Sequence, residues 1–413
     1  MDELKTITGE VFIDGIAQEN RICNLSEDQE KALDFVDEFM KSNTKKSMVI
    51  GGCAGSGKSS IIPFIIDKYR SAHSFEIAYD VEVCAYTGKA VMVLKRKGIV
   101  DAKTLHSFLY RPVVKIDEEG NKIITYEKKH PFEFNSIKLL VVDEASMVNK
   151  VMYDFISSLP FKTIYIGDHF QLPPIDDNFN IMLNPDFKME KVLRQNEDNP
   201  IIQLAEMARN GQRIPLGRYG SSKNTMSLSY EDLMKCDQVL TWTNAAKDKI
   251  NETIRMMKKY DKVNPHKDDK MVVKVNAPQY NLFNGQIVYI MNDPKKSKNG
   301  AWNVELCDEL VYNDPVAMAM LDEYTKVKAS IHLSKEEIDA YRSTFIKNRK
   351  NKYQVHLDWG YALTVHSAQG SSWGNVGIIL EKRLYHIKDA YRWLYTAITR
   401  AENEVTIYTV DKI

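Results

Sequence analysis

The chain has 413 residues, which is too long for one hydrophobic core and predicts two or more domains. Its 56 basic and 56 acidic residues give a net charge of zero, which excludes a uniformly cationic, histone-like binder but not local basic patches. With 44% hydrophobic and 27% charged residues, the composition is that of a globular protein and excludes a disordered chain.

Membrane and secretory signals are missing from the sequence. No run approaches the roughly 18 apolar residues of a spanning helix, and residues 1–15 lack the basic-then-apolar order of a signal peptide. Five isolated cysteines, without a CxxC pair, argue against a disulfide framework or zinc site and suit a reducing compartment. We therefore expect no membrane partner and a cytoplasmic location.

The first part of the chain alternates helical and strand patterns. Residues 25–40 predict an amphipathic helix, with Ser26 as N-cap and Gln29 at the capping-box position. Continuous apolar runs at residues 47–52, 82–87, 139–143 and 163–168 are typical of buried parallel strands. This order predicts an open parallel α/β sheet with ligands at the carboxyl ends of its strands.

Two insertions interrupt this pattern. Two short β-type runs between residues 110 and 134 predict a hairpin. A second strand–helix series starts at Gln238 and returns at residues 362–410, and the runs 270–276, 285–291 and 302–307 between them predict a β-rich insertion. We expect one domain over residues 1–215 with its hairpin at about 109–135, and another over 216–413 with its insertion at about 275–352.

A phosphate-binding loop follows the first strand. Residues 52–59, GCAGSGKS, fit the pattern G-x-x-x-x-G-K-[ST] between a predicted strand and helix. Backbone N–H groups of such a loop point at phosphate oxygens at the helix N-terminus. Lys58 is expected to reach the β- and γ-phosphates and Ser59 to bind Mg²⁺. The expected nucleotide-binding residues here are Gly52, Cys53, Ala54, Gly55, Ser56, Gly57, Lys58, Ser59 and Ser60.

Polar residues end the two later strands. Asp143 is expected to hold Mg²⁺ and Glu144 to act as general base on the attacking water. A helix-capping pair is the alternative. Gln171, in the segment GDHFQLPP, is a candidate sensor of the γ-phosphate, and a proline-stiffened turn is its alternative.

Together these residues resemble the motifs of the superfamily 1 helicases, and more closely those of their RecD and phage Dda branch, superfamily 1B. The resemblance covers about residues 25–410, with the motifs in the family's order. They are the Q motif at 25–29, motif I at 52–59, Ia at 85–90, TLH at 104–106, II at 143–147, III at 167–173, IV at 193–195, TN at 241–244, V at 361–371 and VI at 395–401.

The resemblance implies two RecA-like P-loop domains, with a β-hairpin in the first and a small SH3-like β insertion, opened by the turn 284–286, in the second. It implies ATP and Mg²⁺ as cofactors, adenine recognition by Gln29 and a nucleotide contact at Gly370. Arg194 and Arg400 would serve as arginine fingers, completing the catalytic set of Lys58, Glu144 and Gln171, because domain closure brings them to the γ-phosphate.

A strand-binding surface needs phosphate donors and stacking platforms. The expected contacts lie just past strand ends and are Tyr86, Thr87, Lys89, Thr104, His106, Thr243, Asn244, Thr364, His366 and Ser367. For each, an ordinary cap or loop role is the alternative. Trp242 and Trp373 are further stacking candidates, although burial in a core is the more frequent fate of such aromatic side chains. The basic run 342–352 is a candidate phosphate track or a solvated helix face.

The resemblance therefore implies an ATP-dependent helicase that moves 5′ to 3′ on single-stranded DNA and opens duplex junctions, in a bacterial or phage-infected cell. Single-strand-binding or replisome proteins are candidate partners, and replication, recombination and repair are candidate settings. Two alternatives stay open, a nucleic-acid-stimulated ATPase that displaces proteins and a viral RNA helicase. The hairpin is a candidate strand-separating wedge, although its tip, residues 117–121, is acidic and lacks an aromatic residue.

Overall fold

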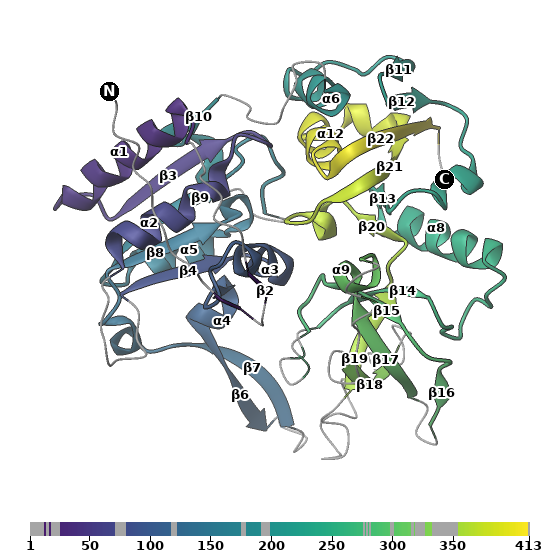
Figure 1. The fold of residues 1–413 in the computed structure, drawn as a ribbon, viewed down its shortest axis with the longest axis horizontal. Coiled ribbons are helices and arrows are strands. Elements are labelled where there is room, and N and C mark those ends of the chain that lie inside the picture. Colours follow the sequence, from purple (N-terminus) through teal and green to yellow (C-terminus); the bar gives the residue numbers. More distant parts are fainter. Residues whose placement is uncertain are drawn as a thin grey trace.

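The computed structural model describes most of the chain. The described residues are 12–13, 16–17, 25–70, 80–116, 122–174, 179–190, 199–275, 277, 280, 282–297, 301–314, 318, 327–332 and 354–411. Figure 1 shows two sheet-containing units side by side, with a β-rich part below the second. No described helix has the length and apolarity needed to cross a membrane.

The first unit is built on a six-stranded sheet in which every described pair is parallel, in the order β10-β3-β9-β8-β4-β5. Its strands are β3 (Ser47–Gly52), β4 (Val81–Ala85), β5 (Lys103–Thr104), β8 (Leu139–Asp143), β9 (Lys162–Gly167) and β10 (Phe187–Met189). The parallel sheet expected from the apolar runs is thus confirmed, because strands covered on both faces are apolar at almost every position.

Helices cover both faces of this sheet. They are α1 (Glu27–Lys41), α2 (Ile62–Tyr69), α3 (Gly88–Arg96), α4 (Leu105–Leu109) and α5 (Lys150–Ser157). The first three share one buried core with the strands, and α4 and α5 share the core on the other face. Helix α1 begins with the expected capping box, in which Ser26 and Gln29 satisfy each other's backbone N–H groups.

Two hairpins accompany the first unit. Strands β6 (Tyr110–Ile116) and β7 (Lys122–Lys128) pair in register from Tyr110 with Lys128 to Ile116 with Lys122, and the hairpin projects away from the sheet (Figure 1). The acidic tip, residues 117–121, lies outside the described residues. Near the N-terminus, β1 (Phe12–Ile13) and β2 (Ile16–Ala17) form a short antiparallel pair.

The second unit has a sheet in the order β11-β12-β22-β21-β13-β20, parallel except for β11. Its strands are β11 (Gly217–Tyr219), β12 (Ser222–Thr225), β13 (Gln238–Thr241), β20 (Ala362–Thr364), β21 (Trp373–Glu381) and β22 (Ala401–Val410). Its helices are α6 (Pro200–Arg209), α7 (Tyr230–Leu233), α8 (Asn244–Met257) and α12 (Ala390–Ile398). Helix α6 packs in this unit's core beside α12 although it precedes residue 216, so the second core begins earlier than the expected boundary.

A small barrel is inserted between α8 and β20. Its strands are β14 (Lys270–Val273), β15 (Ile287–Ile290), β16 (Lys295–Lys296), β17 (Trp302–Asp308), β18 (Val327–His332) and β19 (Gln354–Trp359). Helix α9 (Glu309–Tyr312) comes directly after β17 in the chain. The pairing of β15 with β17 closes the sheet around its own apolar core. The barrel strands start before residue 275 and end after residue 352, so they exceed the expected insertion on both sides.

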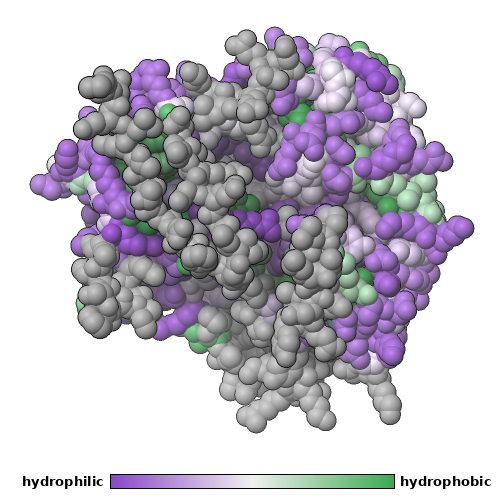
Figure 2. Space-filling model, viewed as in Figure 1, coloured by the Kyte–Doolittle hydropathy of each residue, from purple (hydrophilic) through white to green (hydrophobic). Residues whose placement is uncertain are grey.

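The barrel also touches the first unit. A Cβ atom on Gly88 would stand 2.2 Å from Cβ of Phe283, so the first turn of α3 lies directly against the barrel loop. Beside it, Glu309 accepts from Lys270 at 2.8 Å and from Lys89 of α3 at 3.4 Å. All three side chains are largely buried, and we name them the lysine–glutamate triad. The described residues on the outer face in Figure 2 are, by contrast, mainly hydrophilic.

We predict that Glu309→Ala will lower the free energy of unfolding by about 3–5 kcal/mol, because it leaves two ammonium groups without their buried counter-ion. Urea unfolding followed by tryptophan fluorescence measures this change, since the indole N–H of Trp373 donates to Glu309. The matched control is Lys31→Ala, which breaks an exposed pair with Glu27 and should leave the urea midpoint nearly unchanged. Equal effects of the two substitutions would contradict a structural role of the triad.

Candidate nucleotide site and inter-unit groove

The phosphate loop connects β3 to α2 through the 3-10 turn Lys58–Ser60, which carries Ser59 and Ser60. The loop is tightly folded, because a Cβ atom on Gly52 would lie 2.5 Å from Oγ of Ser56. Nζ of Lys58 donates to the Cys53 carbonyl at 2.7 Å. Nε2 of Gln29 donates to the Gly57 carbonyl at 3.1 Å, so the expected adenine-binding residue lies against the loop.

Asp143 and Glu144 follow β8 as expected and adopt different environments. Asp143 is buried and accepts from the backbone N–H of Glu144 at 3.0 Å. Glu144 has a left-handed backbone conformation (φ 53°). Burial raises the pKa of its carboxyl group, Asp143 and Asp168 raise it further, and the positive charges of Arg400 and Lys58 oppose the rise. Glu144 thus lies within the electrostatic field of both units.

Several polar atoms around the loop fit a bound phosphate and metal ion. Oγ of Ser56, Oγ of Ser146 and Oε1 of Gln171 are buried, and within the described part of the chain none has a hydrogen-bond partner. Buried polar atoms without partners are costly unless a ligand or water satisfies them. The two hydroxyls can donate to phosphate oxygens. The residues present therefore fit a nucleotide with its Mg²⁺.

Helix α12 of the second unit contacts the loop and the segment after β9. The Tyr395 hydroxyl accepts from the backbone N–H of Ala54 at 2.9 Å and donates to Oδ2 of Asp168 at 2.8 Å. Burial raises the pKa of Tyr395, so the hydroxyl keeps the proton that it donates. Asp168 also accepts from Nε2 of Gln171 at 3.4 Å. We name Ala54, Tyr395, Asp168 and Gln171 the tyrosine bridge.

Further hydrogen bonds join the two units beside the tyrosine bridge. Oγ1 of Thr396 accepts from the backbone N–H of Leu172 at 3.0 Å, and Nε2 of Gln369 donates to the Leu172 carbonyl at 3.1 Å. The Arg392 guanidinium donates to the carbonyls of His169 at 2.8 Å and Gln171 at 3.2 Å. The segment after β9 is therefore held by the second unit on several sides.

Of the two expected arginine fingers, the structure describes Arg400 but not Arg194. Arg400 is buried and donates to the carbonyls of Thr396 and Ser371 and to Oγ1 of Thr399, all within its own unit. Its charge nevertheless acts on Glu144. Arg194 and the rest of the segment 193–195 lie outside the described residues, so this finger stays a prediction.

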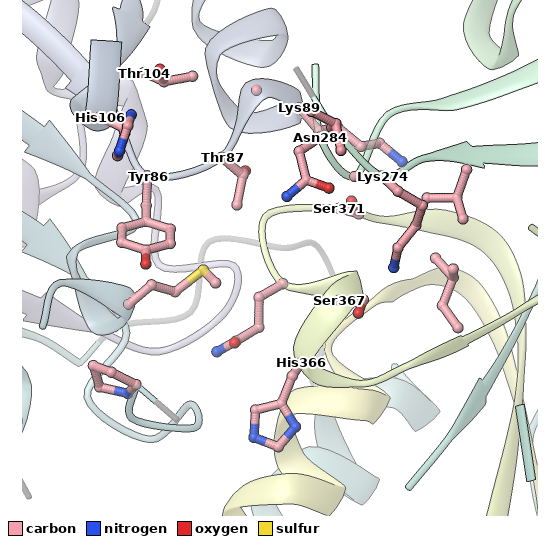
Figure 3. A pocket seen from close by; sticks show the side chains of 18 of the residues that line it. Tyr86, Thr87, Lys89, Thr104, His106, Lys274, Asn284, His366, Ser367 and Ser371 are labelled. Carbon is pink, nitrogen blue, oxygen red and sulfur yellow. The ribbon is translucent and has the colours of Figure 1, made fainter. Parts of the chain in front are cut away.

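A groove of about 620 Å³ runs between the units on another side of their contact (Figure 3). All of the expected strand-binding residues except Thr243 and Thr364 line it. They are Tyr86, Thr87, Lys89, Thr104, His106, Asn244, His366 and Ser367. Figure 3 shows Tyr86, Thr87, Thr104 and His106 on one wall and His366, Ser367 and Ser371 on the facing one. Residues far apart in sequence thus share one groove.

The threonines also perform the cap role that the sequence left open. Thr87, Thr104 and Thr243 each cap a helix, because the side-chain hydroxyl accepts a hydrogen bond from the backbone N–H three residues later in the chain. Oγ1 of Thr364 lies 2.9 Å from Oγ of Ser367. The Gly370 backbone stands next to Oγ1 of Thr87, where a Cβ atom would come within 2.6 Å. Capping uses a lone pair of Thr87 and leaves its hydroxyl hydrogen available to donate into the groove.

Other expected contacts are engaged by protein. Lys89 lies 4.1 Å from the ring centroid of Trp373 and pairs with Glu309. Trp373 is buried, so it is not available as a stacking platform in this arrangement. Trp242 is only partly buried and lies under the Arg383 guanidinium. The basic run 342–352 lies outside the described residues.

The sequence alone missed several residues of these sites. Tyr395 and Asp168 lie in motifs VI and III, but no role was assigned to them. In the groove, exposed Lys274 and the side chains of Asn284 and Tyr126 come from the barrel and the hairpin. A polar residue directly after a buried strand was the available signal for Lys274, whereas nothing in the hairpin pattern distinguished Tyr126.

Two family models match the chain. One is described as an AAA domain and matches residues 37–177, and the other as the UvrD-like helicase C-terminal domain and matches residues 360–408. The first covers most of the first sheet with its phosphate loop, and the second covers β20 to β22 with α12. The chain is therefore similar to an AAA domain in its first unit and to a UvrD-like helicase C-terminal domain in its second.

Relatives narrow the class. The ATP-dependent RecD2 DNA helicase of Deinococcus radiodurans is 25% identical over 92% of this chain and 48% of its own length. The ATP-dependent DNA helicase dda of Enterobacteria phage T4 is 27% identical over 56% of this chain and 57% of its own. The chain thus spans about half the length of these two relatives. The ATP-dependent DNA helicase Pif1 of Campylobacter jejuni is 22% identical over 91% of this chain and 92% of its own length.

Solved structures share the fold. Bacteroides Pif1 bound to ssDNA has a TM-score of 0.55 at 16% identity and covers 93% of this chain and 92% of its own. Pif1 helicase from Candida albicans has a TM-score of 0.51 at 16% identity, with 94% of each chain covered. The ordered motifs and the two family models make the chain similar to the superfamily 1B helicases, and the solved structures share its fold of two RecA-like domains.

We predict that Tyr395→Phe will lower the free energy of unfolding by about 1–3 kcal/mol, because the Ala54 N–H and Asp168 then lose a buried partner. The ring and its contact with Phe170 are kept, so the hydroxyl alone is tested. The control is Tyr391→Phe on the same helix, where the partly exposed side chain should change stability by less than about 0.5 kcal/mol. Unfolding in urea measures both, and indistinguishable midpoints would count against the tyrosine bridge.

Proposed function

We propose that the chain is a Mg²⁺- and ATP-dependent DNA helicase that translocates 5′ to 3′ on single-stranded DNA and opens duplex junctions. The observation that carries this proposal is the shared contact of the two units. One side of it holds the phosphate loop, Glu144 and Arg400, and another side holds the groove with the strand-binding residues. A motor needs both sites on one movable contact, because hydrolysis must change the grip on the strand.

In this proposal ATP is the substrate of the phosphate loop. Lys58 neutralises phosphate charge, Glu144 orients and deprotonates the attacking water, and Arg400 stabilises the γ-phosphoryl group in the transition state. Ser59 and Asp143 would hold Mg²⁺, which would supply further positive charge at the phosphates. The buried, unpartnered Oε1 of Gln171 supports its assignment as the sensor of the γ-phosphate.

The tyrosine bridge supports a route from ATP to the strand. Tyr395 holds Ala54 of the phosphate loop and Asp168, and Asp168 holds Gln171. The next residue after Gln171, Leu172, is bound by Thr396 and Gln369 of the second unit. Gln369 also lines the groove. A change at the γ-phosphate would therefore reach a groove residue through these hydrogen bonds and the peptide bond between Gln171 and Leu172.

The side chains that line the groove support single-stranded nucleic acid as its ligand, bound without recognition of the base sequence. Hydroxyls, amides and two imidazoles line it, and burial lowers the pKa of both His106 and His366, so they contact a strand as neutral groups. Exposed Lys274 supplies charge for phosphates, whereas Lys89 is paired with Glu309 in this arrangement. Contacts of this type fix the backbone and leave the base sequence unread.

Unwinding of matched duplexes with a 5′ or a 3′ single-stranded tail tests the proposed function in one experiment. We expect ATP-dependent opening of the 5′-tailed DNA duplex only, and none by Lys58→Ala, which still binds single strands. Opening of the 3′-tailed duplex alone would reverse the polarity. Preference for RNA-tailed duplexes, or displacement of streptavidin from a biotinylated strand without opening of any duplex, would replace the proposal by one of the two alternatives.

We predict that Glu144→Gln will bind ATP but hydrolyse it at a rate lower by about 10² or more, because the water loses its general base. Phosphate release at saturating ATP and single-stranded DNA measures the rate, and nucleotide binding is measured separately by equilibrium titration. The control is Glu133→Gln, at a partly exposed carboxylate beside the hairpin, with expected wild-type turnover. Wild-type turnover by Glu144→Gln would remove this residue from the reaction.

A further inference from the structure

The second unit carries a row of basic and aromatic side chains on its surface beyond the groove. The segment from the end of β21 to the first turn of α12, residues 382–392, is KRLYHIKDAYR and has four Lys or Arg residues but a single Asp. Since the whole chain is neutral, this excess of positive charge is local. Two residues from elsewhere pack on the segment. We name the set the edge stripe, and it consists of Trp242, Arg383, Tyr385, Lys388 and Arg213.

The register of the second sheet places the edge stripe next to the groove. Strands β13 and β21 are parallel, with Leu240 opposite Ile378, so Trp242 and Arg383 follow their strands at the same carboxyl edge. The Arg383 guanidinium lies 5.2 Å from the ring centroid of Trp242. Two residues further along the chain, Asn244 lines the groove. The edge stripe therefore begins where the groove ends.

Aromatic rings hold the arginines of the edge stripe at the surface. Trp242 and Tyr385 are partly buried and pack against the core of the second unit, so their rings have fixed positions. The guanidinium of exposed Arg213 lies 5.0 Å from the ring centroid of Tyr385. A cation–π contact of this kind orients the guanidinium without neutralising its charge. Its N–H donors stay available for a phosphate group.

Carboxylates do not neutralise the whole stripe. The three that pair with residues 382–392 are Glu381, Asp389 and Asp411. Exposed Arg213 and Lys388, by contrast, form no ion pair with any residue that the structure describes. An exposed cation is stable in water and does not by itself require a ligand. The position of these two cations, on the edge that continues the groove, is what indicates one.

We propose that the edge stripe binds the phosphate backbone of the DNA single strand where the strand leaves the groove. Arg213 and Lys388 contact phosphates, and Trp242 and Tyr385 position the two arginines. This inference rests on the proposed function and extends its strand site onto the second unit alone. Residues of both units line the groove, so its shape changes when the units separate. The edge stripe belongs to one unit and keeps its hold on the strand during that separation.

Fluorescence anisotropy with two lengths of oligo(dT) tests the inference. One is the shortest strand that the wild type binds, and the other is several times longer. The double variant Arg213→Gln/Lys388→Gln should bind the long strand about tenfold more weakly at low salt, because it loses two phosphate contacts. The slope of log affinity against log salt concentration should become shallower by about 0.7 for each contact. Lys388→Gln alone should give half of this change in slope.

The short strand separates the edge stripe from the groove. The double variant should bind it like the wild type, with the same stimulation of ATP hydrolysis, because the groove is intact. The matched control is Lys41→Gln/Lys46→Gln, which removes the same charge from exposed positions before β3, at the opposite edge of the first sheet. This control should leave both affinities unchanged.

Two outcomes would overturn the inference. In one, the double variant binds the long strand as tightly as the wild type. In the other, it weakens the binding of both strands equally, or no more than the matched control does, which indicates a general effect of lost charge. Absence of any single-strand binding by the wild-type protein would instead overturn the proposed function itself. A wild-type urea midpoint for the double variant confirms that it is folded.

Discussion

The hydroxyl of Tyr395 is the contact on which the rest of this structure depends. Its oxygen accepts the Ala54 N–H of one unit while its hydrogen goes to Asp168, so a residue of the second unit completes the phosphate loop of the first. The group is buried, and a buried hydroxyl with both partners satisfied has few alternative positions. The relative placement of the two units at the nucleotide site is therefore set by a directional interaction, whereas apolar packing alone would allow sliding.

The placement of both units also shapes the groove. Thr87 and Gly370 come from different units and approach so closely that a side chain at Gly370 would collide with Thr87. The nucleotide site and the groove are thus two parts of one interface, and neither can rearrange without the other. The hairpin and the barrel extend this interface, with Tyr126 on one side and Lys274 and Asn284 on another.

Features that depend on local sequence could be predicted, and features that depend on docking could not. The first sheet followed from its apolar runs because strands buried on both faces carry a continuous signal, and the capping box of α1 followed from a spacing of three residues. Tyr395 and Asp168 are 227 residues apart, and no local pattern pairs them. Likewise, the amphipathic pattern of α6 shows that one face is buried but not that it packs on the second core.

The lysine–glutamate triad links the electrostatics of the groove to the separation of the units. Lys89 belongs to the first unit and Glu309 to the barrel, so moving the two apart returns an ammonium group to solvent. An open molecule therefore offers one more cation to a phosphate backbone than a closed one. A polyanion that pairs with Lys89 in place of Glu309 stabilises the open form. By linkage, opening of the molecule strengthens binding of that polyanion by the same free energy.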